Sequence, residues 1–188
     1  MLDRQPVLEG PTLLLRPLRA DDWDALYAVA SDPLIWEVHP AHDRWQEEVF
    51  RAFFADALAN GGALAVIDKT ANDTGGAIIG SSRYQGLEDA GGGSIEIGWT
   101  FLARRYWGGT ANREMKRLMV AHALESLAEC RFAVGEANIR SRRAMEKIGA
   151  RLTERSEQRG MAGVGSAHVF YVIGKAEFEG GVLGQMEH

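Results

Sequence analysis

The chain has 188 residues, of which 46% are hydrophobic, and a formal net charge of −5. This length and composition are typical of one globular domain, and we expect a single domain over residues 1–188 with its core at about 8–175. No apolar run approaches membrane-spanning length and residues 1–11 have no signal-peptide core, so we expect a cytoplasmic protein with no membrane partner.

The composition argues against three further kinds of site. The single cysteine, Cys130, excludes an internal disulfide and is expected to be a buried structural thiol in a reducing compartment. The five histidines have no metal-ligand spacing with Cys or carboxylates, so no metal site is predicted. The negative overall charge and the lack of a reader motif argue against nucleic-acid binding.

The first half of the chain contains strand and helix patterns in alternation. Strands are predicted at 8–18, 63–69 and 76–84, and helices at about 21–30 and 45–59. The two helices are separated by a loop at 31–44 that contains Trp36, His39 and His42, and a second loop follows at 86–93. Trp36 is a candidate substrate contact, although plain packing explains it equally well.

The stretch from Ser94 to Glu129 organises the rest of the chain. Ser94–Leu102 is an apolar run typical of a strand, and from about Ala111 to Glu129 apolar residues recur at helical spacing. Between them lies RRYWGGT, residues 104–110, a tight turn with two consecutive glycines. A strand, a glycine turn and a long helix present unpaired backbone N–H groups and a partial positive charge to an anion. The phosphates of a nucleotide-like cofactor are the obvious ligand.

The remaining elements close the sheet. A short strand is predicted at 131–136, a helix at 138–149, and a strand pair at 152–158 and 168–173, with a glycine-bearing turn at 160–165. The resulting order is β-α-α-β-β-β-α-β-α-β-β, with no repeat or linker. The tail at 179–188 is expected to be loosely ordered and to carry no site.

Charge is distributed unevenly along the chain. Residues 104–159 carry 13 Lys or Arg against 7 Asp or Glu, a net charge of +6, and the remainder carries −11. A basic segment around the glycine turn suits an anionic cofactor, and an acidic remainder suits a cationic amine. The alternative for each single charge is a solvated helix face.

The glycine turn matches one known signature. It has neither the lysine of a Walker loop nor the spacing of the dinucleotide fingerprint. It resembles the Q/R-x-x-G-x-G/A signature of the GNAT superfamily of acyl-CoA-dependent N-acyltransferases, with Arg105 opening it and Gly108 as its first glycine. Together with IEIGW and NIRSRRAMEKIGA, it is similar to the RimJ/RimL branch over roughly residues 13–175. The position that is usually Gly or Ala is Thr110, whose backbone N–H can still donate.

The resemblance implies a fold and a cofactor. The fold would be α/β (α+β), a mixed, strongly twisted sheet of six to seven strands with helices on both faces. Acetyl-CoA would lie between two splayed parallel strands, Ser94–Leu102 and Arg131–Glu136, and Trp99 would supply an oxyanion-type N–H. One of Arg140, Arg142 or Arg143 would approach a phosphate. The implied contacts to coenzyme A are Trp99, Thr100, Phe101, Leu102, Arg105, Trp107, Gly108, Gly109, Thr110, Arg113, Asn138 and Arg143. Surface solvation remains an alternative for each arginine.

Glu96 is the first candidate for the general base. Strand alternation places it on one face with Gly98 and Thr100, and burying a carboxylate there costs free energy unless something uses it. The resemblance also places a glutamate on this strand near the reacting amine. The alternative is a salt bridge to a neighbouring arginine such as Arg83.

The general acid is harder to assign. Many relatives carry a tyrosine seven positions past the asparagine that starts the following helix, and this position is Met145 here. The resemblance makes Ser141 a candidate for contacting the sulfur. The alternative is that Asn138 and Ser141 only cap the helix.

These patterns predict an N-acetyltransferase that moves an acetyl group from acetyl-CoA directly to a primary amine. The amine would belong to a protein N-terminus or to a small molecule. Two other hypotheses stay open: a non-catalytic CoA-binding domain, which would tolerate Thr110 and Met145, and a nucleotide-binding structural module. Exposed sheet edges would allow a homodimer, but the sequence does not determine the oligomeric state or the acyl chain.

Overall fold

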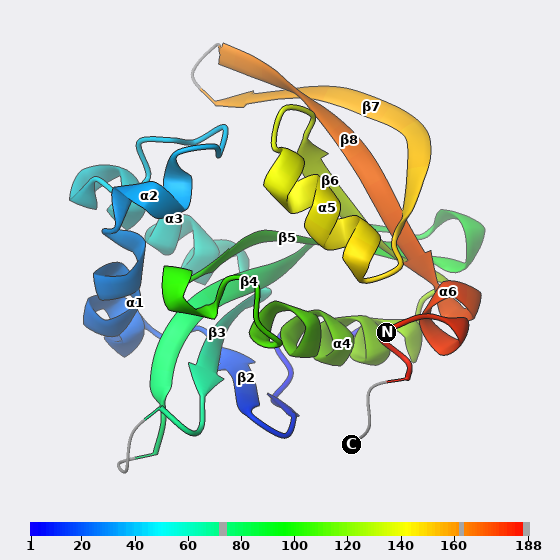
Figure 1. The fold of residues 1–188 in the computed structure, drawn as a ribbon, viewed down its shortest axis with the longest axis horizontal. Coiled ribbons are helices and arrows are strands. Elements are labelled where there is room, and N and C mark those ends of the chain that lie inside the picture. Colours follow the sequence, from blue (N-terminus) through cyan, green and yellow to red (C-terminus); the bar gives the residue numbers. More distant parts are fainter. Residues whose placement is uncertain (72–74, 162–163, 186–188) are drawn as a thin grey trace.

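A computed structural model describes residues 1–71, 75–161 and 164–185 (Figure 1). Its centre is an eight-stranded sheet in the order β1-β2-β3-β4-β5-β6-β8-β7. The strands are β1 (Leu8–Glu9), β2 (Leu13–Pro17), β3 (Ala63–Asp68), β4 (Ala77–Glu88), β5 (Ser94–Leu102), β6 (Glu129–Gly135), β7 (Arg151–Met161) and β8 (Val164–Gly174). The helices are α1 (Trp23–Ala30), α2 (Pro33–Trp36), α3 (Glu47–Asn60), α4 (Ala111–Leu124), α5 (Ile139–Lys147) and α6 (Lys175–Gly180).

Helices cover both faces of this sheet, which confirms the predicted fold class (Figure 1). One apolar core lies between the sheet and α4, α5 and α6, and it contains Met115, Met119 and Cys130. A second core lies on the opposite face under α1, α2 and α3, and it contains Trp36 and Phe50. Burying apolar side chains on both faces is the dominant favourable contribution to folding. None of the described helices combines the length and apolar composition that a membrane span requires.

Several predicted elements differ from the structure. The predicted strand at 8–18 is divided, because the chain turns where the Gly10 N–H donates to the Leu13 carbonyl (2.9 Å) and β1 folds back on β2. This division gives the sheet eight strands, not six to seven. The predicted loop at 31–44 contains α2, which Asp32 caps by accepting from the Leu34 N–H (3.0 Å). The predicted turn at 160–165 lies partly outside the described residues, and β7 and β8 are longer than predicted.

The end of the helix that follows the glycine turn and the C-terminal tail also differ from the prediction. The helix predicted to reach Glu129 ends at Leu124, because the N–H groups of Ser126 and Leu127 turn back to the Ala123 carbonyl and Glu129 already belongs to β6. The tail predicted to be loose begins inside α6, and Leu183 is only 1% exposed in the core beside α4. Residues 186–188 of that tail lie outside the described residues.

The single parallel pair among the described strands is short. β5 and β6 pair only over Ser94–Glu96 and Glu129–Arg131, and beyond these residues their facing edges are not bonded to each other. Trp99 in β5 has a φ of 54°, a left-handed conformation that is uncommon for a bulky residue. The register of β5 against β4 shifts at the same place, between Ser81 and Arg83. The predicted splay of the two strands is therefore present.

The irregularity at Trp99 also changes which way side chains face. The Thr100 hydroxyl accepts a hydrogen bond from Lys116 on α4 (2.8 Å), whereas Glu96 lies on the α3 face beside Gln85. The prediction that Glu96 and Thr100 share a face is therefore wrong, because a bulge resets the alternation of a strand.

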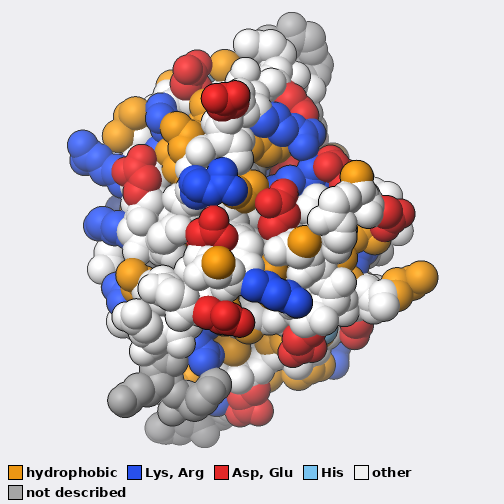
Figure 2. Space-filling view, turned by 90° about the vertical axis from the view of Figure 1, so that its right-hand side faces the viewer, with side chains coloured by type: hydrophobic (Ala, Val, Ile, Leu, Met, Phe, Trp, Pro, Cys, Tyr) orange, Lys and Arg blue, Asp and Glu red, His pale blue; other side chains and the backbone are white. Residues whose placement is uncertain are grey.

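Charged side chains are mixed across the surface seen in Figure 2. On that face Lys and Arg alternate with Asp and Glu, and no broad patch of one sign is visible (Figure 2). The uneven charge of the sequence is thus not gathered there.

Glu114 joins α4 to the start of β2. It is 4% exposed, and its carboxylate accepts hydrogen bonds from the N–H groups of Thr12 (2.8 Å) and Leu13 (2.9 Å) and from the Thr12 hydroxyl (2.6 Å). These bonds fix the first turns of α4 against the sheet, although the two segments are far apart in the sequence.

We predict that Glu114→Ala lowers the free energy of unfolding by about 2–3 kcal/mol, because it removes charge-assisted bonds to buried donors. Glu125→Ala, at the exposed end of the same helix, is the matched control and should change it by less than about 0.5 kcal/mol. Urea denaturation measures both values. Equal losses for the two variants would contradict the role given to Glu114.

Candidate active site

A cavity of about 670 Å³ lies where β5 and β6 separate. Its walls are the end of β5, the end of β6, the glycine turn, the first turns of α4 and one side of α5. Most predicted cofactor contacts line it: Trp99, Thr100, Phe101, Leu102, Trp107, Gly108, Gly109, Arg113, Asn138 and Arg143. Arg105 and Thr110 do not. The structure thus brings together residues that are up to about forty positions apart in the sequence.

The glycine turn opens toward this cavity. Gly108 has a φ of 75°, and no atom lies within 4 Å of where its Cβ would be. Thr110 precedes α4 without a side-chain cap. Within the described part of the chain, the backbone N–H groups of residues 108–113 donate to no protein acceptor. This row of free donors at a helix N-terminus is the geometry that binds phosphate groups.

Four arginines around the turn have different surroundings. Arg113 and Arg143 line the cavity and have no ion pair with a described carboxylate. Arg140 also lines it, and its guanidinium lies 3.9 Å from the centre of the Trp107 ring. Arg142 points elsewhere, donating to the Tyr171 hydroxyl (3.3 Å) and the Glu136 carbonyl (3.3 Å). Among the three predicted alternatives, Arg140 and Arg143 are therefore placed to meet an anion.

Arg105 does not line the cavity but lies against Tyr106, which does. Its guanidinium lies 5.0 Å from the Tyr106 ring centre, and the Tyr106 hydroxyl donates to Asp68 (2.7 Å). Burial and this hydrogen bond raise the pKa of Tyr106. The Trp107 indole N–H donates to the Leu102 carbonyl (3.0 Å), which fixes the turn on the end of β5.

Met145 and the start of α5 form the opposite wall. Met145 is buried and lines the cavity, at the position where the family resemblance implied a tyrosine hydroxyl. Asn138 caps α5 by accepting from the Ser141 N–H (3.1 Å), and both residues line the cavity. The capping alternative is thus realised, and the side-chain amide N–H of Asn138 and the Ser141 hydroxyl remain available for the predicted contacts.

Glu96 lies outside this cavity in a network of its own. It is 5% exposed, and its two oxygens accept from Arg159 on β7 (2.9 and 2.8 Å), while Gln85 donates to Oε1 (2.8 Å). The salt bridge that the sequence offered as the alternative role of Glu96 is therefore present, but its partner is Arg159 and not Arg83, which pairs with Asp56 of α3 (2.8 Å). Oε2 accepts a single described bond, so it retains a lone pair for a water molecule or an amine.

An aromatic cluster is linked to Glu96 through Gln85, which accepts from the Trp99 indole N–H and donates to Glu96. The Arg44 guanidinium is enclosed by the rings of Trp36, Phe53 and Trp99 at 5.2, 4.5 and 5.0 Å. Burial lowers the pKa of Arg44 to about 10. Trp36, the predicted substrate contact, lines the cavity but is 1% exposed and donates its indole N–H to the Ala30 carbonyl (2.7 Å). It is therefore mainly a core residue, and its contact with substrate stays a prediction.

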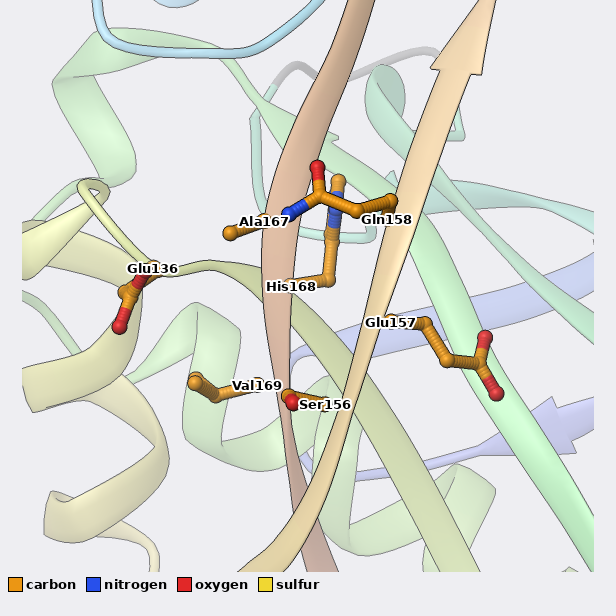
Figure 3. Close-up of a pocket in the computed structure, with 7 residues that line it drawn as sticks. All are labelled: Glu136, Ser156, Glu157, Gln158, Ala167, His168 and Val169. Carbon is orange, nitrogen blue, oxygen red and sulfur yellow. The ribbon is translucent and has the colours of Figure 1, made fainter.

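A smaller cavity of about 300 Å³ lies on the β7–β8 hairpin (Figure 3). Its lining residues are Glu136, Ser156, Glu157, Gln158, Ala167, His168 and Val169. Glu136 and Glu157 lie on opposite sides of His168 (Figure 3). His168 on β8 lines both cavities, so the two cavities lie next to each other at this residue.

The residues that sequence reasoning missed come from distant segments. Gln85, Arg159, Arg44 and Lys116 all contact predicted site residues, and none belongs to the glycine motif. One signal was present in the sequence: Lys116 lies one helical turn before Val120, on the apolar track of α4 that continues to Leu124.

Comparison with known proteins agrees with this geometry. Residues 12–151 match the family model of the acetyltransferase (GNAT) domain. The chain therefore belongs to the GNAT acetyltransferases, which use acetyl-CoA, and it is an acyl-CoA-dependent acetyltransferase. No curated protein matches the chain.

Three solved structures have the same fold. A T. thermophilus protein assigned as an acetyltransferase is 26% identical, with a TM-score of 0.78 over 98% of this chain and 96% of that chain. A GCN5-related N-acetyltransferase from Brucella melitensis is 23% identical, with a TM-score of 0.74 over 96% and 83%. RimJ from Mycobacterium smegmatis, in complex with CoA-disulfide, is 19% identical, with a TM-score of 0.70 over 94% and 91%.

We predict that Arg159→Met destabilises the protein by about 2 kcal/mol, because Glu96 would stay buried with its charge unpaired. Arg155→Met is the matched control on the same strand: both arginines lie over Phe170, but Arg155 pairs with the more exposed Glu88 and Glu157. The control should cost less than about 1 kcal/mol. Chemical denaturation measures the free energy of unfolding of both variants. An equal loss in Arg155→Met would show that the buried Glu96–Arg159 pair stabilises the protein no more than the exposed pairs of Arg155.

Proposed function

We propose that the protein transfers an acetyl group from acetyl-CoA directly to a primary amine. The observation that carries this proposal is the row of free N–H groups at residues 108–113, which opens into a cavity between two separating strands. An acetyl thioester joined to a diphosphate fits this arrangement. The diphosphate would accept hydrogen bonds from these N–H groups, and the arm between the diphosphate and the thioester would lie in the cavity.

The residues present fit this co-substrate from end to end. The diphosphate would lie on residues 108–113, with Arg113, Arg140 and Arg143 nearby. The free edge of β5 at residues 100–102 offers backbone groups to the amides of the pantetheine arm, because the other edge of β5 already pairs with β4. The buried wall of Phe132 and Met145 would exclude water from the thioester.

Glu96 is proposed to accept the proton of the amine. Its position on the α3 side of β5, opposite α4, supports an amine that approaches from the face with Gln85, Arg159 and the Arg44 cluster. Because Glu96 does not line the cofactor cavity, proton transfer would pass through a water molecule on Oε2. Both acceptor classes, a protein N-terminus and a small amine, are compatible with this face.

The first experiment is thermal unfolding with acetyl-CoA, CoA or ATP. Saturating acetyl-CoA and CoA should raise the midpoint by about 5–10 °C, and ATP should not, because a ligand that binds only the folded state stabilises it. Arg143→Gln should weaken acetyl-CoA binding about fivefold through loss of a phosphate contact. Arg142→Gln, its neighbour that points away, should leave it unchanged. Equal shifts with ATP would favour the nucleotide-binding hypothesis and overturn this one.

A second experiment separates an enzyme from a CoA-binding domain. Glu96→Gln should lower the rate of acetyl transfer about 10²–10⁴-fold while CoA still shifts the melting midpoint, because the amide cannot accept the proton. The assay uses acetyl-CoA with a panel of N-terminal peptides and small amines, and it follows the release of free thiol. No transfer to any amine by the wild type, together with full CoA binding, would support the non-catalytic alternative.

A further inference from the structure

Lys116 is a buried cation in the cavity without an acidic partner. It is 2% exposed and lines the cavity where β5 and β6 separate. Its ammonium donates to the Thr100 hydroxyl (2.8 Å) and lies 5.3 Å from the centre of the Phe132 ring. No described carboxylate forms an ion pair with it.

This position is costly for a lysine. A buried ammonium without a carboxylate loses hydration that one hydroxyl and an aromatic ring do not restore. A methionine would fill the same space in a helix whose neighbouring residues, Met115 and Met119, already belong to the core. A charge retained at this cost indicates a ligand that uses it.

The surroundings of Lys116 also prepare it to release a proton. Burial lowers the pKa of Lys116 to about 7. The titratable side chain that acts on it is Cys130 on β6, and burial raises the pKa of that thiol to about 12, so Cys130 stays protonated. Thr100 and Ser82, whose hydroxyls are 2.8 Å apart, complete a neutral environment.

Lys116 stands at the inner end of the site. It lies six residues beyond Thr110, so its Cα is about 9 Å further along α4 than the glycine turn. Its side chain then extends to the gap between Thr100 on β5 and Phe132 on β6. If the diphosphate rests on the turn, the other end of the donor, with its thioester, extends toward this gap.

We propose that Lys116 is the catalytic acid, which donates a proton to the coenzyme A sulfur as it leaves. The proposal rests on the proposed acetyl transfer. The amine nitrogen forms a bond to the acetyl carbon, the carbon–sulfur bond breaks, and its electron pair stays on sulfur. The proton on Nζ of Lys116 moves to that sulfur, and the amine's proton leaves through Glu96 to water. Neutral Lys116 then regains a proton from water, so the cycle needs no other reactant.

As the acid, Lys116 would supply a proton that the α5 wall of the cavity does not provide. Met145 has no proton to give, and the Ser141 hydroxyl is a weak acid at its ordinary pKa. Lys116 approaches from α4, on the other side of the cavity from α5, so the proton donor has a different origin from the tyrosine that the family resemblance implied.

The test follows the thiol of bound CoA, without an acceptor. The ultraviolet absorbance of the thiolate is titrated against pH for CoA bound to wild type, Lys116→Met and Lys116→Arg. In Lys116→Arg, which keeps a fixed positive charge, the pKa of the bound thiol should fall by about one or more relative to free CoA. In wild type the fall should be smaller, because Lys116, with a pKa of about 7, loses its own proton in a neighbouring pH range. In Lys116→Met there should be no fall.

Transfer kinetics then separate a proton donor from a fixed charge. Both variants should lose about 10²–10³-fold in kcat with KM for acetyl-CoA nearly unchanged, because arginine keeps the charge but does not release its proton. Wild-type kcat should fall as pH rises above about 7, and this limb should be absent from the variants. Lys175→Met, at an exposed lysine of α6, is the control and should match wild type.

The melting midpoint of Lys116→Met and its binding of CoA separate the remaining outcomes. Without ligand, Lys116→Met should melt no lower than wild type, because it removes a buried unpaired charge; a marked loss would mean a structural role and would overturn the proposal. Normal CoA binding with an unchanged thiol pKa and kcat in Lys116→Met would overturn it and leave the acetyl-transfer proposal standing. If wild type itself did not bind CoA, both the acetyl-transfer proposal and the Lys116 proposal would be overturned.

Discussion

The site depends on how soon β5 and β6 stop pairing. Only Ser94–Glu96 and Glu129–Arg131 are bonded, and the next residues of both strands have facing edges that are not bonded to each other. A longer parallel ladder would satisfy those edges and close the cavity. The register of β5 against β4 also shifts, around the left-handed backbone of Trp99, so both edges of β5 are irregular in its second half.

The same irregularity places the side chains of Glu96 and Thr100 on opposite faces of β5. Glu96, before it, faces Arg159 and Gln85, and Thr100, after it, faces Lys116. The carboxylate is paired and the ammonium has no described carboxylate beside it, so the two faces of β5 differ in electrostatics although they are a few residues apart. In the proposed acetyl transfer, Glu96 would take a proton on one face and Lys116 would give one on the other.

Much of the fold followed from local patterns, and the contacts across the sheet did not. Apolar periodicity located α3, α4 and the central strands, and the glycine turn with its helix located the free N–H groups. The partner of Glu96 could not be predicted, because Arg159 reaches it from the far hairpin and its choice over Arg83 depends on tertiary packing. The face of Thr100 was missed because nothing in SIEIGWTFL signals the left-handed φ of Trp99.

Lys116 shows where local patterns and function disagree. Lys116 lies on the helical track of Val120 and Leu124, which predicts an apolar residue at this position, and the structure has a buried ammonium instead. Such a conflict between local preference and burial is expected at functional sites. Relatives with the same fold at 19–26% identity share the sheet, whereas chemistry depends on individual side chains within it. In this chain a methionine at position 145 and a buried lysine on the other side of the cavity both accord with the proposal that the proton comes from α4 and not from α5.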